Sequence, residues 1–166
     1  MHRIFDGTTS HLDAAALIWA RATAARDGDA EIASLAEARP IIAGVLGASQ
    51  RALLVVAEAG GQAEAFAAVA PVPGSEEIAE LQYLGTDPSA WGTGAARELL
   101  AALPTLLRER GFGQARLSVY TDNERAVRLY EGMGWVPDGV PVPHHRTGKS
   151  EQRYMLALRV GSAITG

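Results

Sequence analysis

The sequence of 166 residues contains no cysteine. It therefore predicts no disulfide and no thiolate-bound metal cluster. A cysteinyl intermediate is excluded as well, so any group transfer by this chain would favour direct attack by the acceptor. The adjacent pair His144-His145 lies in a proline-rich stretch with no carboxylate or cysteine spacing around it that supports a metal site. We therefore expect no bound metal.

Long apolar runs and an excess of positive charge are also missing. The longest apolar stretches fall short of the roughly 20 residues that cross a bilayer. Nothing near the N-terminus combines a basic region, an apolar core and a cleavage site. The formal net charge of −4 argues against binding to nucleic acid or to anionic membranes. These features predict a cytoplasmic protein with no membrane and no nucleic-acid partner.

What is present describes an ordinary globular protein, with 48% hydrophobic and 20% charged residues. A chain of this length suits one domain that buries about two thirds of its unfolded surface. We therefore predict a single domain over residues 1–166.

The first half of the chain predicts a strand, two helices and a hairpin. Thr8, Thr9 and Ser10 offer N-cap hydroxyls for the first helix, and Pro40 is expected to start or kink the second half of the next one. The turn at 60–61 joins two β-rich runs. The expected elements are a strand at 1–5, helices at about 11–26 and 33–46, and antiparallel strands at 51–58 and 62–72.

The second half alternates strands and helices. Its central helix carries leucines on one side and is followed by Gly111 as the expected C′ residue, while Pro104 predicts a kink or break inside it. The expected elements are strands at 77–86 and 114–121, helices at 95–110 and 123–131, a strand beginning at Trp135-Val136, a loop at 137–149, and a last strand at 151–160. The chain therefore predicts a mixed α/β single layer.

A glycine-rich turn at 91–96 lies where a strand has ended and a helix begins. Such a junction exposes unpaired backbone N–H groups and the positive end of the helix dipole, which together favour a phosphate. It lacks the Gly-Lys-Ser/Thr ending of a Walker A loop, and Arg97 stands where a dinucleotide fingerprint needs Gly or Ala. A plain strand-to-helix turn remains the structural alternative.

Motifs on both sides of the glycine-rich turn support the interpretation that it binds a phosphate. The segment Trp91-Gly92-Thr93-Gly94-Ala95-Ala96 resembles the Q/R-x-x-G-x-G/A pyrophosphate signature of the GNAT superfamily of acyl-CoA-dependent N-acetyltransferases, although Trp91 departs from the usual polar first position. The segment 84–88 resembles the family's L-x-V-x-P strand ending, with Thr86 replacing valine. Residues 123–135 resemble its second block, and the likeness covers about residues 77–160.

The resemblance implies an α/β fold of the GNAT type, with a central mixed, mostly antiparallel, splayed β-sheet flanked by helices. It implies acetyl-CoA as cosubstrate, with no metal. Asn123 would cap the following helix and also touch the pantetheine arm, or serve as an N-cap alone. The positions expected to bind the carrier are Leu84, Gly85, Thr86, Trp91, Gly92, Thr93, Gly94, Ala95, Ala96, Arg97 and Asn123.

Two side chains are expected to carry the chemistry. Tyr130 would donate a proton to the leaving thiolate, the alternative being a buried aromatic that packs with Met133 and Trp135. Glu80 would act as the general base, the alternative being a solvated or hydrogen-bonded strand residue. Period-two alternation predicts that Glu80, Gln82, Leu84 and Thr86 share one strand face.

The acceptor has no motif of its own. The resemblance implies the primary amine of a small molecule or peptide, attacked in a ternary complex, and relatives often form homodimers. Trp19 is expected in the core or in the substrate pocket, and the acidic residues of 27–31 either attract a cationic amine or form an exposed loop. Alternatives are a protein N-terminal or lysine acetyltransferase and a CoA-binding sensor without transfer activity.

Overall fold

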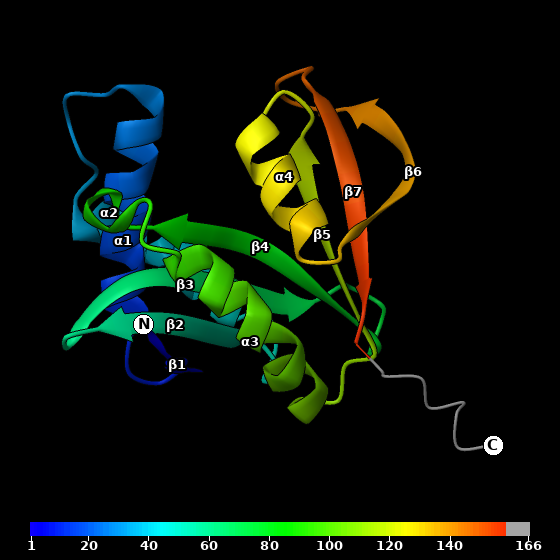
Figure 1. The fold of residues 1–166 in the computed structure, drawn as a ribbon, viewed down its shortest axis with the longest axis horizontal. Coiled ribbons are helices and arrows are strands. Elements are labelled where there is room, and N and C mark those ends of the chain that lie inside the picture. The colour runs from blue at the N-terminus through cyan, green and yellow to red at the C-terminus, as the bar shows by residue number, and fades with distance from the viewer. Residues whose placement is uncertain (159–166) are drawn as a thin grey trace.

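The computed structural model describes residues 1–158 and contains one sheet flanked by helices (Figure 1). The strands are β1 (Arg3–Asp6), β2 (Leu53–Ala59), β3 (Gln62–Pro71), β4 (Ile78–Thr86), β5 (Gln114–Tyr120), β6 (Val136–Pro143) and β7 (Ser150–Ala157). The helices are α1 (Leu12–Asp27), α2 (Leu35–Leu46), the 3-10 helix η1 (Pro88–Ala90), α3 (Ala95–Glu109) and α4 (Glu124–Gly132).

The sheet has seven strands in the order β1-β2-β3-β4-β5-β7-β6. All neighbouring pairs are antiparallel except β4 and β5. These two run parallel and pair only from Ile78 to Glu80 with Gln114 to Arg116, after which they diverge (Figure 1). The predicted fold, a mixed, mostly antiparallel and splayed sheet, is confirmed.

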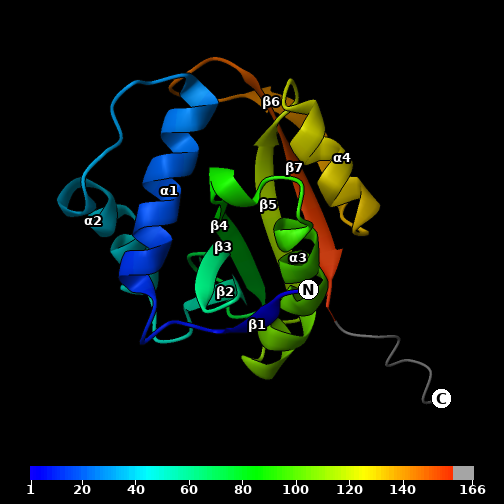
Figure 2. The ribbon, with the colours of Figure 1, turned by 60° about the vertical axis from the view of Figure 1, so that its left-hand side comes forward.

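Helices cover both faces of the sheet (Figure 2). Alternation along β2 directs Leu53 and Val55 into a core with α3 and α4, and Leu54 and Val56 into a second core with α1 and α2. We call these two sides the α3/α4 face and the α1/α2 face. No helix within residues 1–158 has the length and apolarity that a membrane span requires.

The leucine face of α3 explains why the helix tolerates a proline. Leu99, Leu100, Leu103 and Leu107 are all buried, and α3 continues through Pro104 without the expected break. Burial of one leucine contributes roughly 2 kcal/mol, so four of them outweigh the cost of about 3 kcal/mol for a proline inside a helix. The φ angle of +89° at Gly111 confirms the predicted helix stop.

The starts of the first two helices differ from expectation. His11 precedes α1 without a capping side chain, because the Thr8 hydroxyl instead donates to Asp6 and accepts from the main-chain N–H of Leu54. The first helix therefore lacks the predicted Thr or Ser cap. Ser34 starts α2 with a complete capping box, and the helix runs on through Pro40.

The predicted loop at 137–149 is wrong over its first half, where the structure has strand β6. Its prolines are tolerated because β6 is the edge strand and pairs only with β7. The pairing shifts register between Asp138 and Val142, which takes Gly139 and Pro141 out of the ladder. In β7 the described strand ends at Ala157, and the expected end at residue 160 lies outside the described residues.

Candidate active site

The opening between β4 and β5 defines the candidate active site. Beyond Glu80, β4 is paired with β3 alone, and beyond Arg116, β5 is paired with β7 alone. The main-chain groups of β4 that face β5 therefore lack a strand partner over residues 81–86. Backbone donors and acceptors in such a gap need another ligand, which a linear polar chain can supply.

A β-bulge at Gln82 resets the side chains of β4. Ala68 opposes Tyr83 while Val69 opposes Leu81, so Gln82 is the extra residue. Leu81 and Leu84 consequently both point to the α3/α4 face. The predicted common face for residues 80, 82, 84 and 86 is therefore wrong, because alternation does not continue across a bulge.

Gly85 allows β4 to lie close to the second core. A Cβ atom at this position would lie 2.6 Å from Cε1 of Phe66, which is fully buried.

Trp91 contacts the end of β4. The carbonyl oxygen of Thr86 accepts a hydrogen bond from the indole N–H of Trp91, 3.1 Å away. The exposed Trp91 ring thus ties the loop back to the strand that precedes it.

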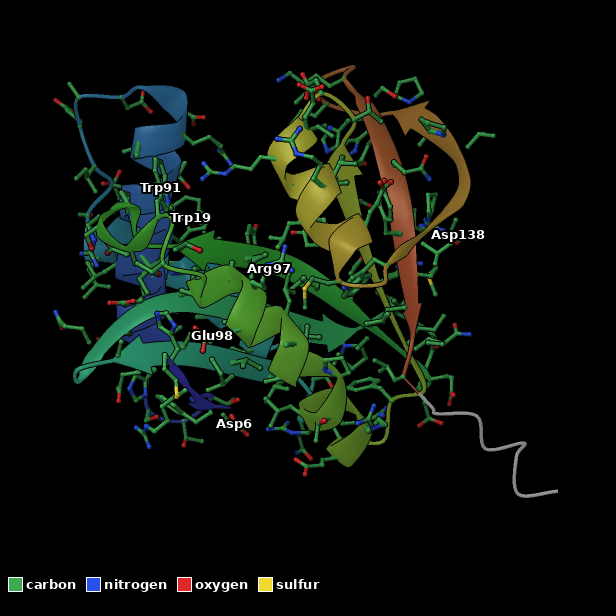
Figure 3. All side chains as sticks on the ribbon, viewed as in Figure 1. Asp6, Trp19, Trp91, Arg97, Glu98 and Asp138 are labelled. Atoms are coloured by element: carbon green, nitrogen blue, oxygen red, sulfur yellow. The ribbon has the colours of Figure 1, made fainter. Side chains whose placement is uncertain are left out.

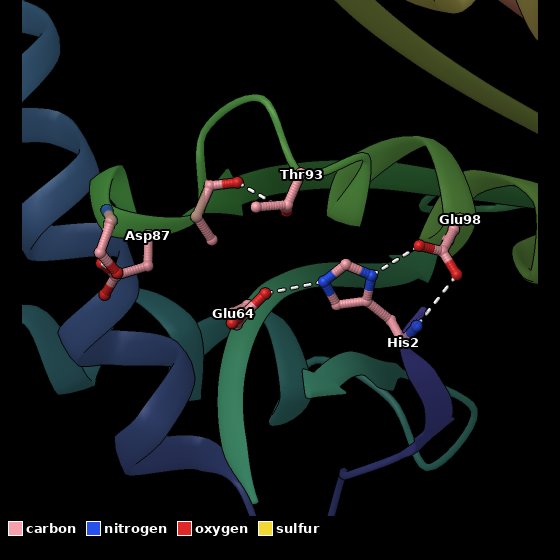
Figure 4. Close-up of polar contacts among 7 residues, drawn as sticks. His2, Glu64, Asp87, Thr93 and Glu98 are labelled. Carbon is pink, nitrogen blue, oxygen red and sulfur yellow. Dashed lines mark hydrogen bonds and ion pairs between the residues drawn. The ribbon is translucent and has the colours of Figure 1, made fainter. Parts of the chain in front are cut away.

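The glycine loop connects η1 to α3 and is held by short polar contacts (Figure 4). Both the main-chain nitrogen and the hydroxyl of Thr93 donate to the Ala90 carbonyl, at 3.2 and 2.7 Å. Gly92 and Gly94 have φ angles of +83° and +87°, a region that L side chains rarely adopt. The loop therefore depends on glycine for its conformation.

Unpaired amides converge at the start of α3. The first helical hydrogen bond runs from the nitrogen of Glu98 to the oxygen of Gly94, so the N–H groups of Ala95, Ala96 and Arg97 have no acceptor within residues 1–158. The helix dipole adds partial positive charge at the same place. Donors in this arrangement fit the oxygens of a phosphate group.

The side chain of Arg97 lies between α3 and α4 (Figure 3). Its Nη1 atom lies 3.6 Å from Sδ of Met133, which follows the last turn of α4. The guanidinium forms no ion pair with the described residues. It therefore remains available for an anion beside the loop.

Asp87 anchors the loop, a role that the sequence did not reveal. Its carboxylate accepts from the nitrogen and hydroxyl of Ser89, at 3.0 and 2.8 Å, and pairs with Arg21 of α1 at 2.7 Å. Burial alone would raise the pKa of Asp87, but the bonds from Ser89 and Arg21 outweigh it and lower that pKa. The Asp-Pro-Ser run, typical of a capped helix start, was the available signal.

Tyr130 lies in α4 and is buried in the α3/α4 core. Its ring packs edge-on against Trp135, with 6.1 Å between the ring centroids, and burial raises the pKa of the phenol to about 12. No residue of the described chain hydrogen-bonds to its hydroxyl. The phenol stays protonated at physiological pH and can act as a donor. The packing role is confirmed, and the role as an acid stays a prediction.

Glu80 forms an ion pair with Arg116 across the last pairing rung of β4 and β5, with 3.2 Å between Oε2 and Nε. Its neighbours Ala79 and Leu81 point into the α3/α4 core, so Glu80 faces the α1/α2 side. The structure thus places Glu80 and Tyr130 on opposite faces of the sheet. The hydrogen-bonded alternative is confirmed, and the role as a base stays a prediction.

Asn123 caps α4, because its side-chain oxygen accepts from the nitrogen of Ala126 at 3.2 Å. The predicted N-cap is confirmed, whereas its contact with a carrier stays a prediction.

A cavity of roughly 520 Å³ opens on the α1/α2 side, between α1 and the segment that follows it. Trp19 lines it and also packs against the second core, so both roles considered for this residue are compatible. The other lining residues include Asp29, Glu31, Ile32 and Glu37. No group of His, Cys, Asp or Glu among residues 1–158 has the arrangement of a metal site.

A splayed sheet whose central helix begins at a glycine loop was the arrangement expected from the resemblance to the GNAT superfamily. The model of the acetyltransferase (GNAT) family matches residues 15–135, and the chain belongs to this family. The matched family is one of acetyltransferases.

The chain is similar over almost its full length to the ribosomal-protein-S18-alanine N-acetyltransferase of Escherichia coli. The TM-score is 0.75 at 25% identity, covering 98% of this chain and 97% of that one. The structure of yncA from Salmonella typhimurium, solved with its cofactor acetyl-CoA, has a TM-score of 0.70 at 17% identity and coverages of 97% and 96%. This second likeness concerns the fold alone.

Among curated proteins, the chain is similar to the mycothiol acetyltransferase of Streptosporangium roseum. The two are 38% identical over 73 residues, which is 44% of this chain and 22% of that protein. The match thus spans about a fifth of the relative's length. It supports the family and leaves the acceptor open.

Proposed function

We propose that this protein transfers the acetyl group of acetyl-CoA to the primary amine of a small molecule or peptide. The observation that carries the proposal is the set of unpaired amides at residues 95–97, next to the gap between β4 and β5. A diphosphate on these amides and a pantetheine arm along β4 would satisfy main-chain groups that the described chain leaves without partners.

In this proposal the carrier is held mostly by main chain. Of the predicted amides from Gly92 to Arg97, that of Thr93 already donates to Ala90, so those of Ala95, Ala96 and Arg97 take the diphosphate, and the guanidinium of Arg97 adds a charged contact. The main chain of 84–86 and the side chain of Asn123 flank the pantetheine arm. A donor from the main chain of 84–86 also stabilises the oxyanion that develops on the thioester carbonyl.

The acetyl group moves in a single displacement, because the chain contains no cysteine to accept it. The attacking amine forms the new C–N bond, the C–S bond breaks, and the departing thiolate takes a proton. Tyr130 supplies that proton, since its hydroxyl is protonated and has no partner within residues 1–158. Glu80, acting through water, is our candidate to remove the proton from the amine.

The relatives suggest two classes of acceptor. The curated relatives are named mycothiol acetyltransferases, which supports a small-molecule acceptor. The likeness to the S18-alanine N-acetyltransferase extends over nearly the whole chain and supports a protein N-terminus as the second candidate. We favour the first class. Experiment must decide whether lysine side chains are acetylated and whether the protein forms a homodimer.

Calorimetry with acetyl-CoA, followed by thiol release with a panel of small amines and of peptides with free N-termini, tests the proposal. We expect saturable binding and release of one thiol per acetylated amine. Binding without thiol release on any amine would indicate a CoA-binding sensor instead. Absence of binding at millimolar acetyl-CoA would refute the proposal altogether.

A further inference from the structure

A buried histidine bridges two acidic side chains directly below the glycine loop (Figure 4). His2 precedes β1, and only 3% of its side chain is exposed. Its Nε2 lies 2.7 Å from Oε1 of Glu64 on β3, and its Nδ1 lies 2.6 Å from Oε2 of Glu98 on α3. The main-chain nitrogen of His2 also donates to Oε1 of Glu98, at 3.0 Å.

With both carboxylates ionised, this geometry requires a charged ring. A neutral imidazole has one N–H, so it could donate to one carboxylate and would turn a lone pair toward the other. The imidazolium donates to both. The hydrogen bond to Glu98 raises the pKa of His2 above its usual value, burial opposes this, and the bond to Glu64 adds to the rise.

Glu98 stands at the place where the carrier's diphosphate is expected. It belongs to the first turns of α3, and its Oε2 would lie 4.0 Å from a Cβ atom on Gly94. An uncompensated carboxylate there would repel a diphosphate and compete with it for the helix N-terminus. Both carboxylate oxygens are instead bonded to His2.

The N-terminal ammonium of Met1 also helps to lower the pKa of Glu98 through its charge, without an ion pair among the described residues. The other side-chain cations near this end of the sheet have different partners. Arg3 pairs with Glu58 at 3.1 Å, and Arg21 pairs with Asp87. The guanidinium of Arg97 is directed to Met133. Within residues 1–158, His2 is therefore the cation that forms an ion pair with Glu98.

We propose that His2 is a positioning residue for carrier binding: its imidazolium neutralises Glu98 and holds that carboxylate off the glycine loop, so that deprotonation of His2 weakens the affinity for coenzyme A. This inference rests on the proposed function, because it assumes that the loop binds the carrier's diphosphate. The geometry also determines whether the affinity rises or falls with pH. Affinity is highest while the ring is charged and falls as the pH rises through the pKa of His2, which lies above 6.5.

A double-mutant cycle on the full chain tests this. Calorimetry with coenzyme A is run from pH 6 to pH 9 on the wild type, His2→Gln, Glu98→Gln and the double variant. We expect His2→Gln to weaken binding about tenfold at pH 6, the scale of a single coupled charge. Glu98→Gln should bind as tightly as the wild type at pH 6 and lose the alkaline decline.

The double variant separates electrostatics from packing. If His2 acts through the charge of Glu98, adding Glu98→Gln to His2→Gln restores the affinity. If the role of His2 were purely structural, adding Glu98→Gln would not restore the affinity. The matched controls are His11→Gln and Glu58→Gln, a neighbouring histidine and glutamate 3.9 Å apart that do not touch the loop. Thermal unfolding of each variant shows that it is folded.

Three results would overturn the inference while leaving the proposed function intact. These are unchanged affinity in His2→Gln, a double variant as weak as His2→Gln, and the same alkaline decline in Glu98→Gln as in the wild type. Where His2→Gln does not fold, the pH series of Glu98→Gln alone decides the matter. A wild type that binds no coenzyme A would overturn the proposed function and this inference together.

Discussion

Under the proposed function, the carrier side and the acceptor side of this molecule would recognise their ligands in different ways. On the carrier side the groups on offer are mostly main-chain amides, placed by Gly92, Gly94 and the start of α3. On the acceptor side the cavity beside α1 is lined by side chains such as Trp19 and Asp29. Recognition by main-chain groups requires glycine at particular positions and a helix that begins at a particular residue. Recognition by side chains allows the residue at each lining position to vary.

This difference explains why one side carries a motif and the other does not. A loop that needs positive φ angles admits few residues, so the carrier side is marked in the sequence. The acceptor cavity needs only a shape and a charge, which many sequences provide. The variants below test whether the two sides are as separable as this comparison suggests.

The largest effect is expected from Tyr130→Phe. Loss of the proton donor should lower kcat between about 100-fold and 10,000-fold, the range of general acid catalysis. Calorimetry should show unchanged affinity for acetyl-CoA, because the described chain makes no hydrogen bond to the hydroxyl that is removed. Retention of full turnover on a confirmed acceptor would assign Tyr130 to packing alone.

The high pKa of Tyr130 adds a pH test. Because the folded pKa of about 12 exceeds the unfolded value of 10.0, the phenol favours the folded state up to about pH 10, and this contribution is lost as the pH rises toward 12. The pH profile of kcat should therefore show no alkaline limb from this group below pH 10. A limb near pH 8 that disappears in Tyr130→Phe would contradict the assignment.

Tyr154→Phe should affect stability and leave turnover alone. The hydroxyl of Tyr154 on β7 donates to Oε2 of Glu131 on α4 at 2.7 Å, and the side chain is buried. Loss of a hydrogen bond to a charged group costs about 2 kcal/mol of unfolding free energy. Denaturant titration measures this loss. An equal fall in kcat for both tyrosine variants would mean that removal of either hydroxyl disturbs α4.

A glycine pair compares the two sides directly. Gly94 (φ +87°) opens α3, and Gly28 (φ +71°) ends α1, with no clash to a Cβ atom at either position. Alanine at each site should therefore cost a similar 1 kcal/mol or so of stability. We expect Gly94→Ala to weaken acetyl-CoA binding about tenfold, because one strained residue displaces the amides beside it. Gly28→Ala should leave that affinity unchanged.

If both alanine variants weakened carrier binding equally, the effect would come from general destabilisation and not from the loop.

The sequence predicted the fold wherever local pattern and burial agree. The leucines of α3 and the alternating residues of β2 define the cores, and the motif at 91–96 locates the loop. Among the expectations that were wrong, two concern the sheet and have clear physical reasons. The bulge at Gln82 interrupts the alternation of β4, and the prolines of β6 are accommodated at a sheet edge. Local secondary-structure propensity predicts neither feature.

The contacts around the loop were less predictable still. Arg21 and Asp87 are separated by 66 residues in the chain, and His2 and Glu98 by 96. Pairs of this kind depend on tertiary placement, so a single sequence does not reveal them. The sequence could identify the glycine loop, but not the side chains that hold it.

The smallest effects are expected from replacing two arginines that form ion pairs, one on α1 and one on α2. Arg21 of α1 meets Asp87 beneath the loop, where 13% of the aspartate side chain is exposed. Arg39 of α2 meets Asp13 of α1 in the open, where 58% of the aspartate side chain is exposed. We expect Arg39→Gln to change stability by less than about 0.5 kcal/mol and Arg21→Gln to cost about 1 kcal/mol, since exposed pairs are screened by water.

Acid titration distinguishes the two ion pairs further. The pKa of Asp87 is lowered in the folded state, so its contribution is present above the unfolded value of 3.8 and is lost as the pH falls through the folded value. Arg21→Gln should therefore flatten the acid limb of stability below pH 4, and Arg39→Gln should leave it unchanged. Arg21 belongs to the acceptor side and Asp87 to the carrier side. A shift in acetyl-CoA affinity for Arg21→Gln alone would show that the two sides are coupled through this pair.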